Sequence, residues 1–182
     1  MKGILFKPEM IKAIVKGRKT QTRRVIKPQP IVAENYKGIT IEDLEFDGFK
    51  PHYHVGEVAY IKEVFYEQEE IWADDHFEPS GSIFYKTDYQ GVVGGISWQS
   101  SLCMPARIAR YFIQITDAKP QRLQEITEED AEKEGLISQR IYDCGTCRLK
   151  FKLLWDSINP RYPWESNPWV FVYSFKLVEK EA

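Results

Sequence analysis

The sequence has few cysteines and no long apolar run, and each shortage argues against a class of protein. Three cysteines are an odd number in a chain of 182 residues, which argues against a disulfide framework of the secreted type. No apolar run approaches the roughly 18 residues that a membrane-spanning helix needs, and the N-terminal apolar stretch is too short for a signal peptide. We therefore expect a cytoplasmic protein with no membrane partner.

The net charge is also small, but the charges are segregated along the chain. A formal net charge of -2 argues against a generally basic protein that coats nucleic acid. Six basic residues and no acidic residue lie between Lys16 and Lys27, whereas residues 67–78 and 125–134 are strongly acidic. A basic segment of this size suits a ligand that carries phosphate.

The composition suits one ordinary domain. Hydrophobic residues make up 43% and aromatic residues 14% of the chain, enough for a single core, so we expect one domain over 1–182 with loop insertions near 28–55 and 67–105. Periodicity and breaker residues predict helices over 9–16, 127–135 and 147–158, and strands over 56–66, 82–86, 107–118 and 170–175. Because no regular βαβ unit occurs, the pattern predicts an α+β fold with a mixed, curved or barrel-like sheet.

Lys19 and Thr22 are the first candidates for chemistry. Their spacing places them on opposite faces of a strand, so the segment must bend for them to converge. Crowding by Arg18, Arg23 and Arg24 should lower the pKa of Lys19, so that its neutral amine could accept a proton from the Thr22 hydroxyl. A lysine paired with a hydroxyl nucleophile is an alternative to a histidine-based triad.

Two glutamates add to these candidates. Glu134 lies in the last turn of a predicted helix, where the negative end of the helix dipole favours a nearby cation, and the basic segment could provide it. Lys19, Thr22 and Glu134 would then supply a base, a nucleophile and a proton-shuttling carboxylate for hydrolysis of an amide. Glu63 lies on the apolar face of a predicted strand, either salt-bridged to the basic segment or in contact with a ligand. The alternatives are a solvated basic turn and a solvated acidic helix.

One pair of cysteines has the spacing of metal ligands. Cys144 and Cys147 could form a tetrahedral zinc site with His52 and His54. A single CxxC motif is weak evidence, and the two histidines come from a distant loop. We therefore expect no metal and no cofactor, with zinc as the weaker alternative.

Five segments together carry a family resemblance. They are 17–24 (GRKTQTRR), 56–63 (GEVAYIKE), 123–135 (LQEITEEDAEKEG), 154–159 (LWDSIN) and 167–170 (NPWV). The first three resemble an ASCH domain, the activating-signal-cointegrator homology domain of the PUA-like superfamily. The last two resemble the version of this domain that phages and prophages encode.

The resemblance implies a PUA-like β-barrel with flanking helices and a cleft suited to RNA or a modified nucleoside. Small bacterial ASCH enzymes remove the acetyl group from N4-acetylcytidine with a lysine and a threonine in a Gly-Arg-Lys-Thr-x-Thr motif, which Lys19 and Thr22 match, and with a glutamate at the position of Glu134. Arg110 fits the phage pattern, whereas Arg107 replaces its usual tryptophan. The candidates for ligand binding are Arg18, Arg23, Arg24, Glu63 and Arg110.

These observations lead to one functional hypothesis and two alternatives. The chain is expected to bind RNA or a nucleotide-like ligand, and to hydrolyse an acyl amide on a modified cytidine in the sharper version of the hypothesis. One alternative is RNA binding without catalysis, in which the basic segment holds phosphates and the loop residues Trp72 and Trp98 stack on bases. The other is a phage protein-interaction module whose basic segment contacts an acidic partner.

Overall fold

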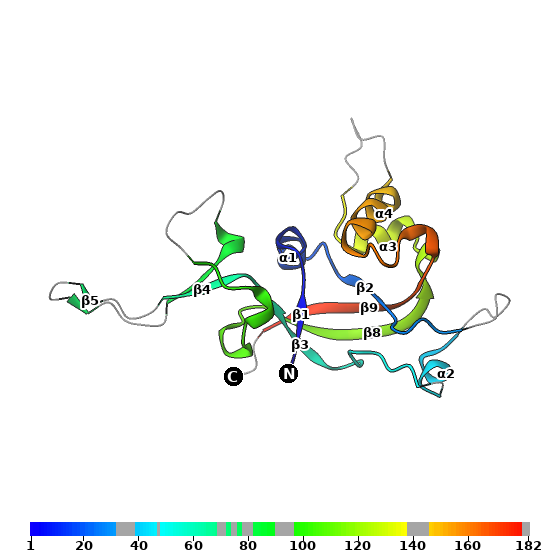
Figure 1. Cartoon of the computed structure of the whole chain (residues 1–182), viewed down its shortest axis with the longest axis horizontal. Coiled ribbons are helices and arrows are strands. Elements are labelled where there is room, and N and C mark those ends of the chain that lie inside the picture. The colour runs from blue at the N-terminus through cyan, green and yellow to red at the C-terminus, as the bar shows by residue number, and fades with distance from the viewer. Residues whose placement is uncertain are drawn as a thin grey trace. The chain divides into compact units, whose positions relative to one another are not determined.

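The structure is a computed structural model, and it describes residues 1–31, 39–46, 48–68, 72–73, 76–77, 82–89, 97–137 and 146–179. The described part of the chain is α+β, with four α-helices, a sheet of five strands and two small two-stranded sheets (Figure 1). None of its helices is long and apolar enough to cross a membrane. The α+β class expected from the sequence is therefore confirmed.

The elements have the following bounds. The five-stranded sheet contains β1 (Lys2–Leu5), β2 (Gln21–Val25), β3 (Val58–Lys62), β8 (Phe112–Arg122) and β9 (Trp169–Val178). The small sheets pair β4 (Phe65–Glu67) with β7 (Ile83–Tyr85), and β5 (Trp72–Ala73) with β6 (His76–Phe77). The α-helices are α1 (Pro8–Val15), α2 (Ile41–Phe46), α3 (Glu128–Lys133) and α4 (Cys147–Ile158). The 3₁₀ turns are η1 (Lys86–Asp88), η2 (Ser101–Cys103), η3 (Ala106–Ile108), η4 (Leu123–Glu125) and η5 (Trp164–Ser166).

The main sheet is open, so the predicted barrel is wrong for the described residues. The strand order is β1-β3-β8-β9-β2, in which β1 pairs parallel with β3 and β2 pairs antiparallel with β9. Closure into a barrel requires the two edge strands to pair with each other. In this order β1 and β2 are the edges, and each has one neighbour.

The chain divides into two compact units. The first unit contains Met1–Lys12, Val58–Ile113 and Val178–Ala182, and the second contains Ala13–Glu57 and Gln114–Leu177. Each unit has its own cluster of buried apolar side chains. In the first unit Tyr60, Phe65 and Met104 belong to this cluster. Each unit is therefore described by itself.

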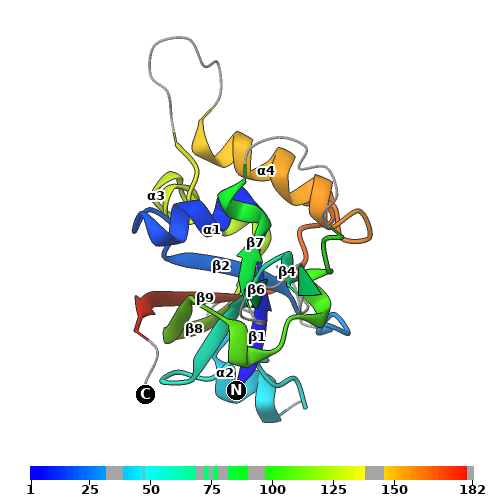
Figure 2. The same cartoon turned by 90° about the vertical axis from the view of Figure 1, so that its left-hand side faces the viewer.

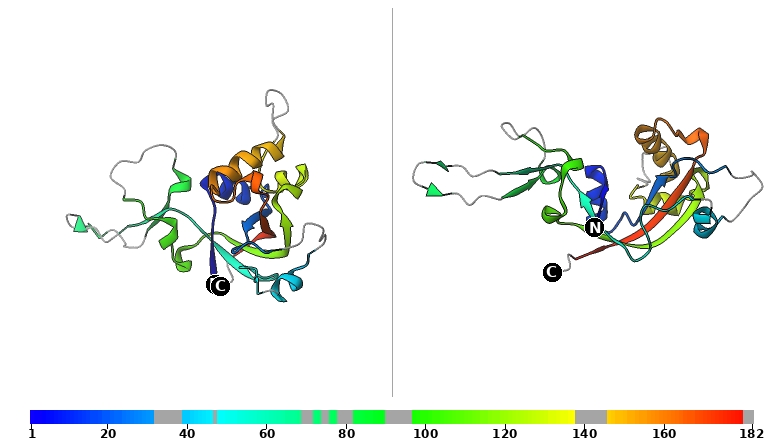
Figure 3. Two further views of the ribbon diagram at one scale, coloured as in Figure 1. Left: turned by 45° about the vertical axis from the view of Figure 1, so that its right-hand side comes forward. Right: turned by 60° about the horizontal axis from the view of Figure 1, so that its bottom comes forward.

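In the second unit, α3 and α4 cover one face of the sheet. Figures 1 and 2 show both helices on the same side of β2 and β9, and Figure 3 shows β8 and β9 running side by side along curved paths. Phe151 and Trp155 of α4 pack with Ala131 of α3 and with Val170 and Val172 of β9. This packing holds α3 close to β2, which lies within the basic segment.

The helices predicted near both ends of the chain are confirmed. The helix predicted over 147–158 is α4, and α1 matches the helix predicted over 9–16 to within one residue at each end. Thr127 caps α3, because its hydroxyl accepts a hydrogen bond from the amide of Asp130 at 3.1 Å. These elements are set by local signals, namely caps, breakers and helical periodicity.

Two other expectations need correction. The strand predicted over 56–66 is two strands, β3 and β4, because the chain leaves the main sheet at Glu63. The strand predicted from Arg107 begins only at Phe112, after the turn η3. The segment 28–55, expected to be mostly loop, is mostly without helix or strand among its described residues and contains the short helix α2. A capping box begins this helix, since Thr40 accepts from the amide of Asp43 at 3.2 Å while the Asp43 carboxylate accepts from the amide of Thr40 at 2.9 Å.

The cap of α3 gives a first prediction. Thr127→Ala should lower the free energy of unfolding by about 1 kcal/mol, because the amide of Asp130 loses its acceptor. Urea denaturation measures this loss. Thr127→Ser is the matched control, because it keeps the oxygen and should unfold close to the wild type. An equal loss in both variants would contradict the capping role.

Candidate functional site

The basic segment contains β2, and the structure brings its Lys19 to the end of α3. Lys19 forms an isolated antiparallel bridge with Glu134. The Nζ atom of Lys19 donates to Oε2 of Glu134 at 2.6 Å, to the backbone oxygen of Glu134 at 3.0 Å and to that of Gln21 at 2.9 Å. Each of the three ammonium hydrogens therefore has an acceptor. With Lys19 2% exposed and Glu134 5% exposed, this is a buried ion pair.

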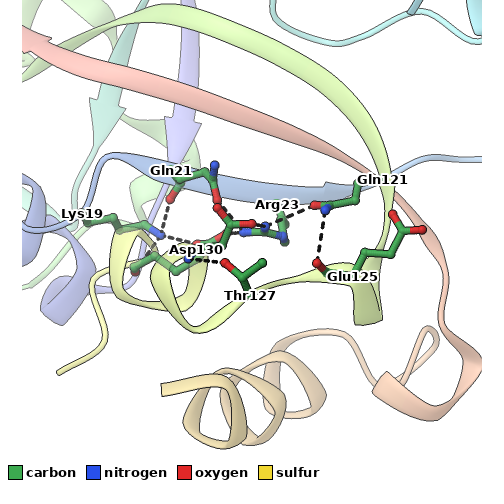
Figure 4. A network of polar contacts seen from close by, with 8 residues as sticks. Lys19, Gln21, Arg23, Gln121, Glu125, Thr127 and Asp130 are labelled. Atoms are coloured by element: carbon green, nitrogen blue, oxygen red, sulfur yellow. Dashed lines mark hydrogen bonds and ion pairs between the residues drawn. The ribbon is translucent and has the colours of Figure 1, made fainter. Parts of the chain in front are cut away.

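Arg23 holds the other oxygen of the same carboxylate, and Figure 4 shows Arg23 between Gln21 and Gln121. Its Nη1 atom donates to Oε1 of Glu134 at 3.1 Å and to Oε1 of Gln21 at 2.8 Å. Its Nη2 atom donates to Oδ2 of Asp130 at 3.0 Å and to Oε1 of Gln121 at 3.2 Å. Glu134 thus lies between two cations, each bound to a different oxygen.

The charges of this network balance. Lys19 and Arg23 are two cations, and Glu134 and Asp130 are two carboxylates. Burying a charge in a protein is costly unless it is paired and hydrogen-bonded, and both conditions are met here. One donor is left over, because the buried Nε atom of Arg23 has no hydrogen-bond partner in the part of the chain that the structure describes. Nearly all of the buried donors in the network, but not the Nε atom of Arg23, therefore have a hydrogen-bond partner.

The pKa of Lys19 lies below its ordinary value. Burial is the largest cause, since it disfavours the ammonium form, and the ion pair with Glu134 opposes it. The charges of Arg24 and Arg23 lower this pKa further, but less than burial does. Crowding by arginines, the cause expected from the sequence, is thus a lesser contribution.

Gly135 lets the end of α3 approach the lysine. Its φ of +92° is a left-handed conformation that glycine adopts without strain, as is common just after a helix. A Cβ atom at this position would lie 3.0 Å from Cβ of Lys19 and 3.1 Å from Cβ of Ala13. The helix stop recognised in the sequence is therefore also a point of close packing against Lys19.

Thr22 and Arg24 extend from the other face of β2. Side chains alternate along a strand, and the register places Thr22 directly opposite Tyr173 of β9. Thr22 is only 3% exposed. Burial lowers the pKa of Arg24, and the nearby Tyr53 and Glu134 oppose this effect.

A hollow lies near this face, beside α2. Its volume is about 470 Å³, and its lining includes Tyr53, His54 and Lys119. The ring of Tyr53 meets that of Tyr173 edge-on, with centroids 5.5 Å apart. Burial raises the pKa of Tyr53 to about 12. Tyr53 therefore connects the wall of the hollow with the face of β2 that carries Thr22.

The other ligand-binding candidates have different positions. Arg18 is exposed, and its guanidinium lies 3.5 Å from the backbone oxygen of Gly135. Glu63 and Arg110 belong to the first unit. One of the two roles considered for Glu63 was a salt bridge to the basic segment. Its carboxylate is paired with Arg110, which donates to Oε2 through Nε and to Oε1 through Nη2, both at 2.8 Å.

Arg110 also binds a second carboxylate. Its Nη1 and Nη2 atoms donate to the two oxygens of Asp88, at 2.6 and 3.0 Å, and Thr87 donates to Glu63 from the same turn. The guanidinium lies 4.0 Å from the ring centroid of Tyr85. Burial alone would lower the pKa of Arg110, but the hydrogen bonds to Glu63 and Asp88 outweigh it and the net shift is upward. Arg110 is therefore a permanent cation between two carboxylates.

The zinc alternative finds no support in the described residues. Cys144 lies outside them, and Cys147 is buried in the apolar cluster under α4. His52 and His54 are exposed. Across the described ranges, no group of three or more His, Cys, Asp or Glu side chains is placed to hold a metal ion.

Sequence reasoning missed several members of these networks. Asp130 had a signal, because it lies one helical turn before Glu134 and shares its face. Gln21 and Gln121 had none, since a glutamine in a strand gives no sign of its partner. Asp88 likewise gave no sign of its contact with Arg110.

The buried ion pair gives a second prediction. Glu134→Gln leaves Lys19 without its carboxylate and should cost about 3 kcal/mol of unfolding free energy. Adding Lys19→Met to this variant removes the uncompensated cation, so it should recover part of the loss. Urea denaturation of the single and double variants measures the recovery. Lys133→Met in the Glu134→Gln background is the matched control, because Lys133 is exposed and should recover nothing; equal effects of the two lysine changes would rule out the buried pair.

The lowered pKa of Lys19 gives a third prediction. Between its folded pKa and the ordinary value of 10.5, the unfolded chain binds the extra proton at Lys19 and the folded chain does not. Unfolding then takes up a proton, so the Lys19 contribution to the unfolding free energy rises with pH through this window. Urea denaturation at about pH 8 and about pH 10 should show wild type gaining on Lys19→Met as the pH rises. A constant or falling difference would contradict the lowered pKa.

Comparisons with known proteins do not show a family for this chain. No protein-family model matches the sequence, and no curated protein matches it. Among solved structures, it is similar to the crystal structure of protein EF3133 from Enterococcus faecalis V583, which carries the family designation DUF984. The TM-score is 0.43 at 11% identity, over 92% of this chain and 66% of that chain, just under two thirds. A likeness at this level identifies neither the fold nor the activity.

Proposed function

We propose that the chain is an RNA- or nucleotide-ligand-binding domain of the ASCH type, and that Lys19, Thr22 and Glu134 hydrolyse an acyl amide on a modified cytidine. The contact between Lys19 and Glu134 carries this proposal. The two residues lie 115 positions apart, and they are the lysine and glutamate that the ASCH resemblance selects. A solvated basic turn and a solvated acidic helix would have no reason to meet at 2.6 Å below the surface.

The geometry near Thr22 brings Lys19 to the strand that carries the proposed nucleophile, but not to the face from which its hydroxyl extends. The amine of Lys19 contacts the backbone oxygen of Gln21, which belongs to the peptide bond that precedes Thr22. The lysine therefore reaches the strand where the proposed nucleophile is attached, although Thr22 extends from the opposite face to Arg23.

The proposed reaction is an acyl transfer followed by hydrolysis. The reaction requires the Thr22 hydroxyl, which in this structure extends from the opposite face of β2 to Arg23, to come within hydrogen-bond distance of the Lys19 amine. Neutral Lys19 then accepts the hydroxyl proton as Oγ1 of Thr22 forms a bond to the carbonyl carbon of the acyl group. The bond from that carbon to the N4 nitrogen breaks, and the nitrogen receives the proton, with Glu134 assisting its movement. Water then cleaves the threonine ester, which releases the acid and restores the hydroxyl. The sum is one amide and one water converted into one amine and one acid.

The burial of the same residues favours a second candidate, binding without catalysis. Lys19, Thr22 and Glu134 are each no more than 5% exposed, and every donor of Lys19 already has an acceptor. An ion pair of this kind can serve the fold alone. In this version Arg18, which is exposed, provides a contact for phosphate.

The fourth prediction separates these candidates. Incubation of the protein with N4-acetylcytidine should release cytidine, measured by chromatography. Thr22→Val should lower the rate by more than about a hundredfold, because valine keeps the shape of threonine but lacks the nucleophile. Thr20→Val is the matched control, since Thr20 is exposed two residues earlier and should keep full activity.

Three outcomes decide the proposal. Equal rates for Thr22→Val and Thr20→Val would remove Thr22 as nucleophile. No cytidine from the wild type, together with salt-sensitive binding of RNA or a cytidine nucleotide, would leave the binding version. Neither hydrolysis nor binding would refute both versions.

A further inference from the structure

We propose that the hollow beside α2 binds a small zwitterion with an apolar side group, of which an aromatic amino acid is the simplest example. All residues that line the hollow belong to the second unit and lie within 39–55 or 118–120. The lining includes none of Lys19, Thr22 and Glu134, so the inference does not rest on the function proposed for them.

Most of the lining is apolar. Its apolar residues are Ile39, Ile41, Pro51, Val55, Ala118 and Pro120. The volume of about 470 Å³ falls within the range of about 300–1,000 Å³ that small-molecule pockets occupy. Val55 is 61% exposed, so part of this apolar wall is in contact with solvent. A ligand that covers the wall would remove apolar surface from water, which favours binding.

The polar part of the lining carries two opposite charges. One is the carboxylate of Glu42 on α2, and the other is the ammonium of Lys119 on β8. Among the ion pairs of the described residues, none includes Glu42 or Lys119, so these two charges do not neutralise each other across the hollow. Both side chains are exposed, and each can therefore bind a group of opposite charge on a ligand.

The other polar residues of the lining select less by charge. The hydroxyl of Thr40 donates to Oδ2 of Asp43 at 2.9 Å and accepts from the amide of Asp43 at 3.2 Å, so it belongs to the cap of α2. Burial raises the pKa of Tyr53 to about 12, which keeps its phenol neutral. His54 is exposed. The charge preference of the hollow therefore depends mainly on Glu42 and Lys119.

A zwitterion with an apolar side group matches all three features. Its carboxylate accepts hydrogen bonds from the Lys119 ammonium, its own ammonium donates to the Glu42 carboxylate, and its side group covers the apolar wall. An apolar acid or an apolar amine would pair with only one of the two charges. A nucleotide would bring its phosphate close to the Glu42 carboxylate, which repels it.

Isothermal titration calorimetry of the full chain with four probes tests the proposal. L-Phenylalanine has all three features, whereas glycine lacks the apolar group, 3-phenylpropionate lacks the ammonium and 2-phenylethylamine lacks the carboxylate. Phenylalanine should bind, and each of the other probes should bind at least about fivefold more weakly. The reason is the loss of one exposed ion pair for the two phenyl compounds and the loss of apolar contact for glycine.

Two charge variants assign the contacts. Lys119→Met should weaken phenylalanine and 3-phenylpropionate about fivefold and leave 2-phenylethylamine unchanged. Glu42→Gln should weaken phenylalanine and 2-phenylethylamine by a similar factor and leave 3-phenylpropionate unchanged. Lys176→Met on β9 and Glu45→Gln on α2 are the matched controls, because both residues are exposed and lie outside the lining, and they should change no affinity.

A third variant tests the apolar wall. Val55→Asp places a charge in the wall and should weaken phenylalanine, whereas Leu153→Asp, at an exposed apolar residue of α4 outside the lining, should not. Absence of phenylalanine binding, or binding that is the same in the wild type and in the Lys119, Glu42 and Val55 variants, would overturn the proposal. Binding of 3-phenylpropionate as tight as that of phenylalanine would overturn it in favour of an apolar acid. Release of cytidine from N4-acetylcytidine should be the same in these variants as in the wild type, so a failure of the proposed function is distinguishable from a failure here.

Discussion

The second unit is organised around the need to satisfy one buried ammonium group. An ammonium that is almost wholly enclosed needs three acceptors, and Lys19 finds two of them at Glu134 and one at Gln21. These acceptors come from the end of α3 and the start of β2, so the two elements must meet there. That meeting requires a residue without a side chain at Gly135, and it requires Arg23 to bind the remaining oxygen of the carboxylate. Helix position, chain conformation and charge balance therefore depend on the same amine.

Both units use an arginine that joins two carboxylates beside an aromatic ring. Arg23 joins Glu134 and Asp130 and lies 5.8 Å from the ring centroid of Phe151. Arg110 joins Glu63 and Asp88 and lies 4.0 Å from that of Tyr85. Their burial differs, since the side chain of Arg23 has no exposed surface whereas 24% of that of Arg110 is exposed. The planar guanidinium with its fixed donors suits both places, and a lysine could not bind both carboxylates in the same way.

Local features of the sequence predicted the local features of the fold. The signals that predict α3 and α4 lie within a few residues of these helices. They are Thr127 before α3, Gly135 after it, and the helical periodicity of 147–158. Barrel closure and the partner of Glu63 depend on contacts between segments that lie far apart in the sequence. A short stretch of sequence does not contain both partners of such a contact. The same limit applies to the site. Lys19 and Glu134 were selected, but Arg23 was assigned to a ligand because its sequence neighbourhood is basic, and its carboxylate partners lie more than a hundred positions away.

The balance of charges around Lys19 also restricts what the proposed site can bind. Two cations and two carboxylates already neutralise one another, so a phosphate placed among them would have to displace Glu134 or Asp130 from Arg23. An uncharged group such as the amide of an acylated base would leave these pairs intact. The proposed chemistry therefore fits the buried side of the site, and recognition of phosphate falls to the exposed Arg18.

Proton transfer by Lys19 then depends on two opposing effects, because burial and the charge of Arg24 favour the neutral amine while Glu134 favours the ammonium. A ligand that draws Glu134 away from Lys19 would favour the neutral amine, which is the form that the reaction needs.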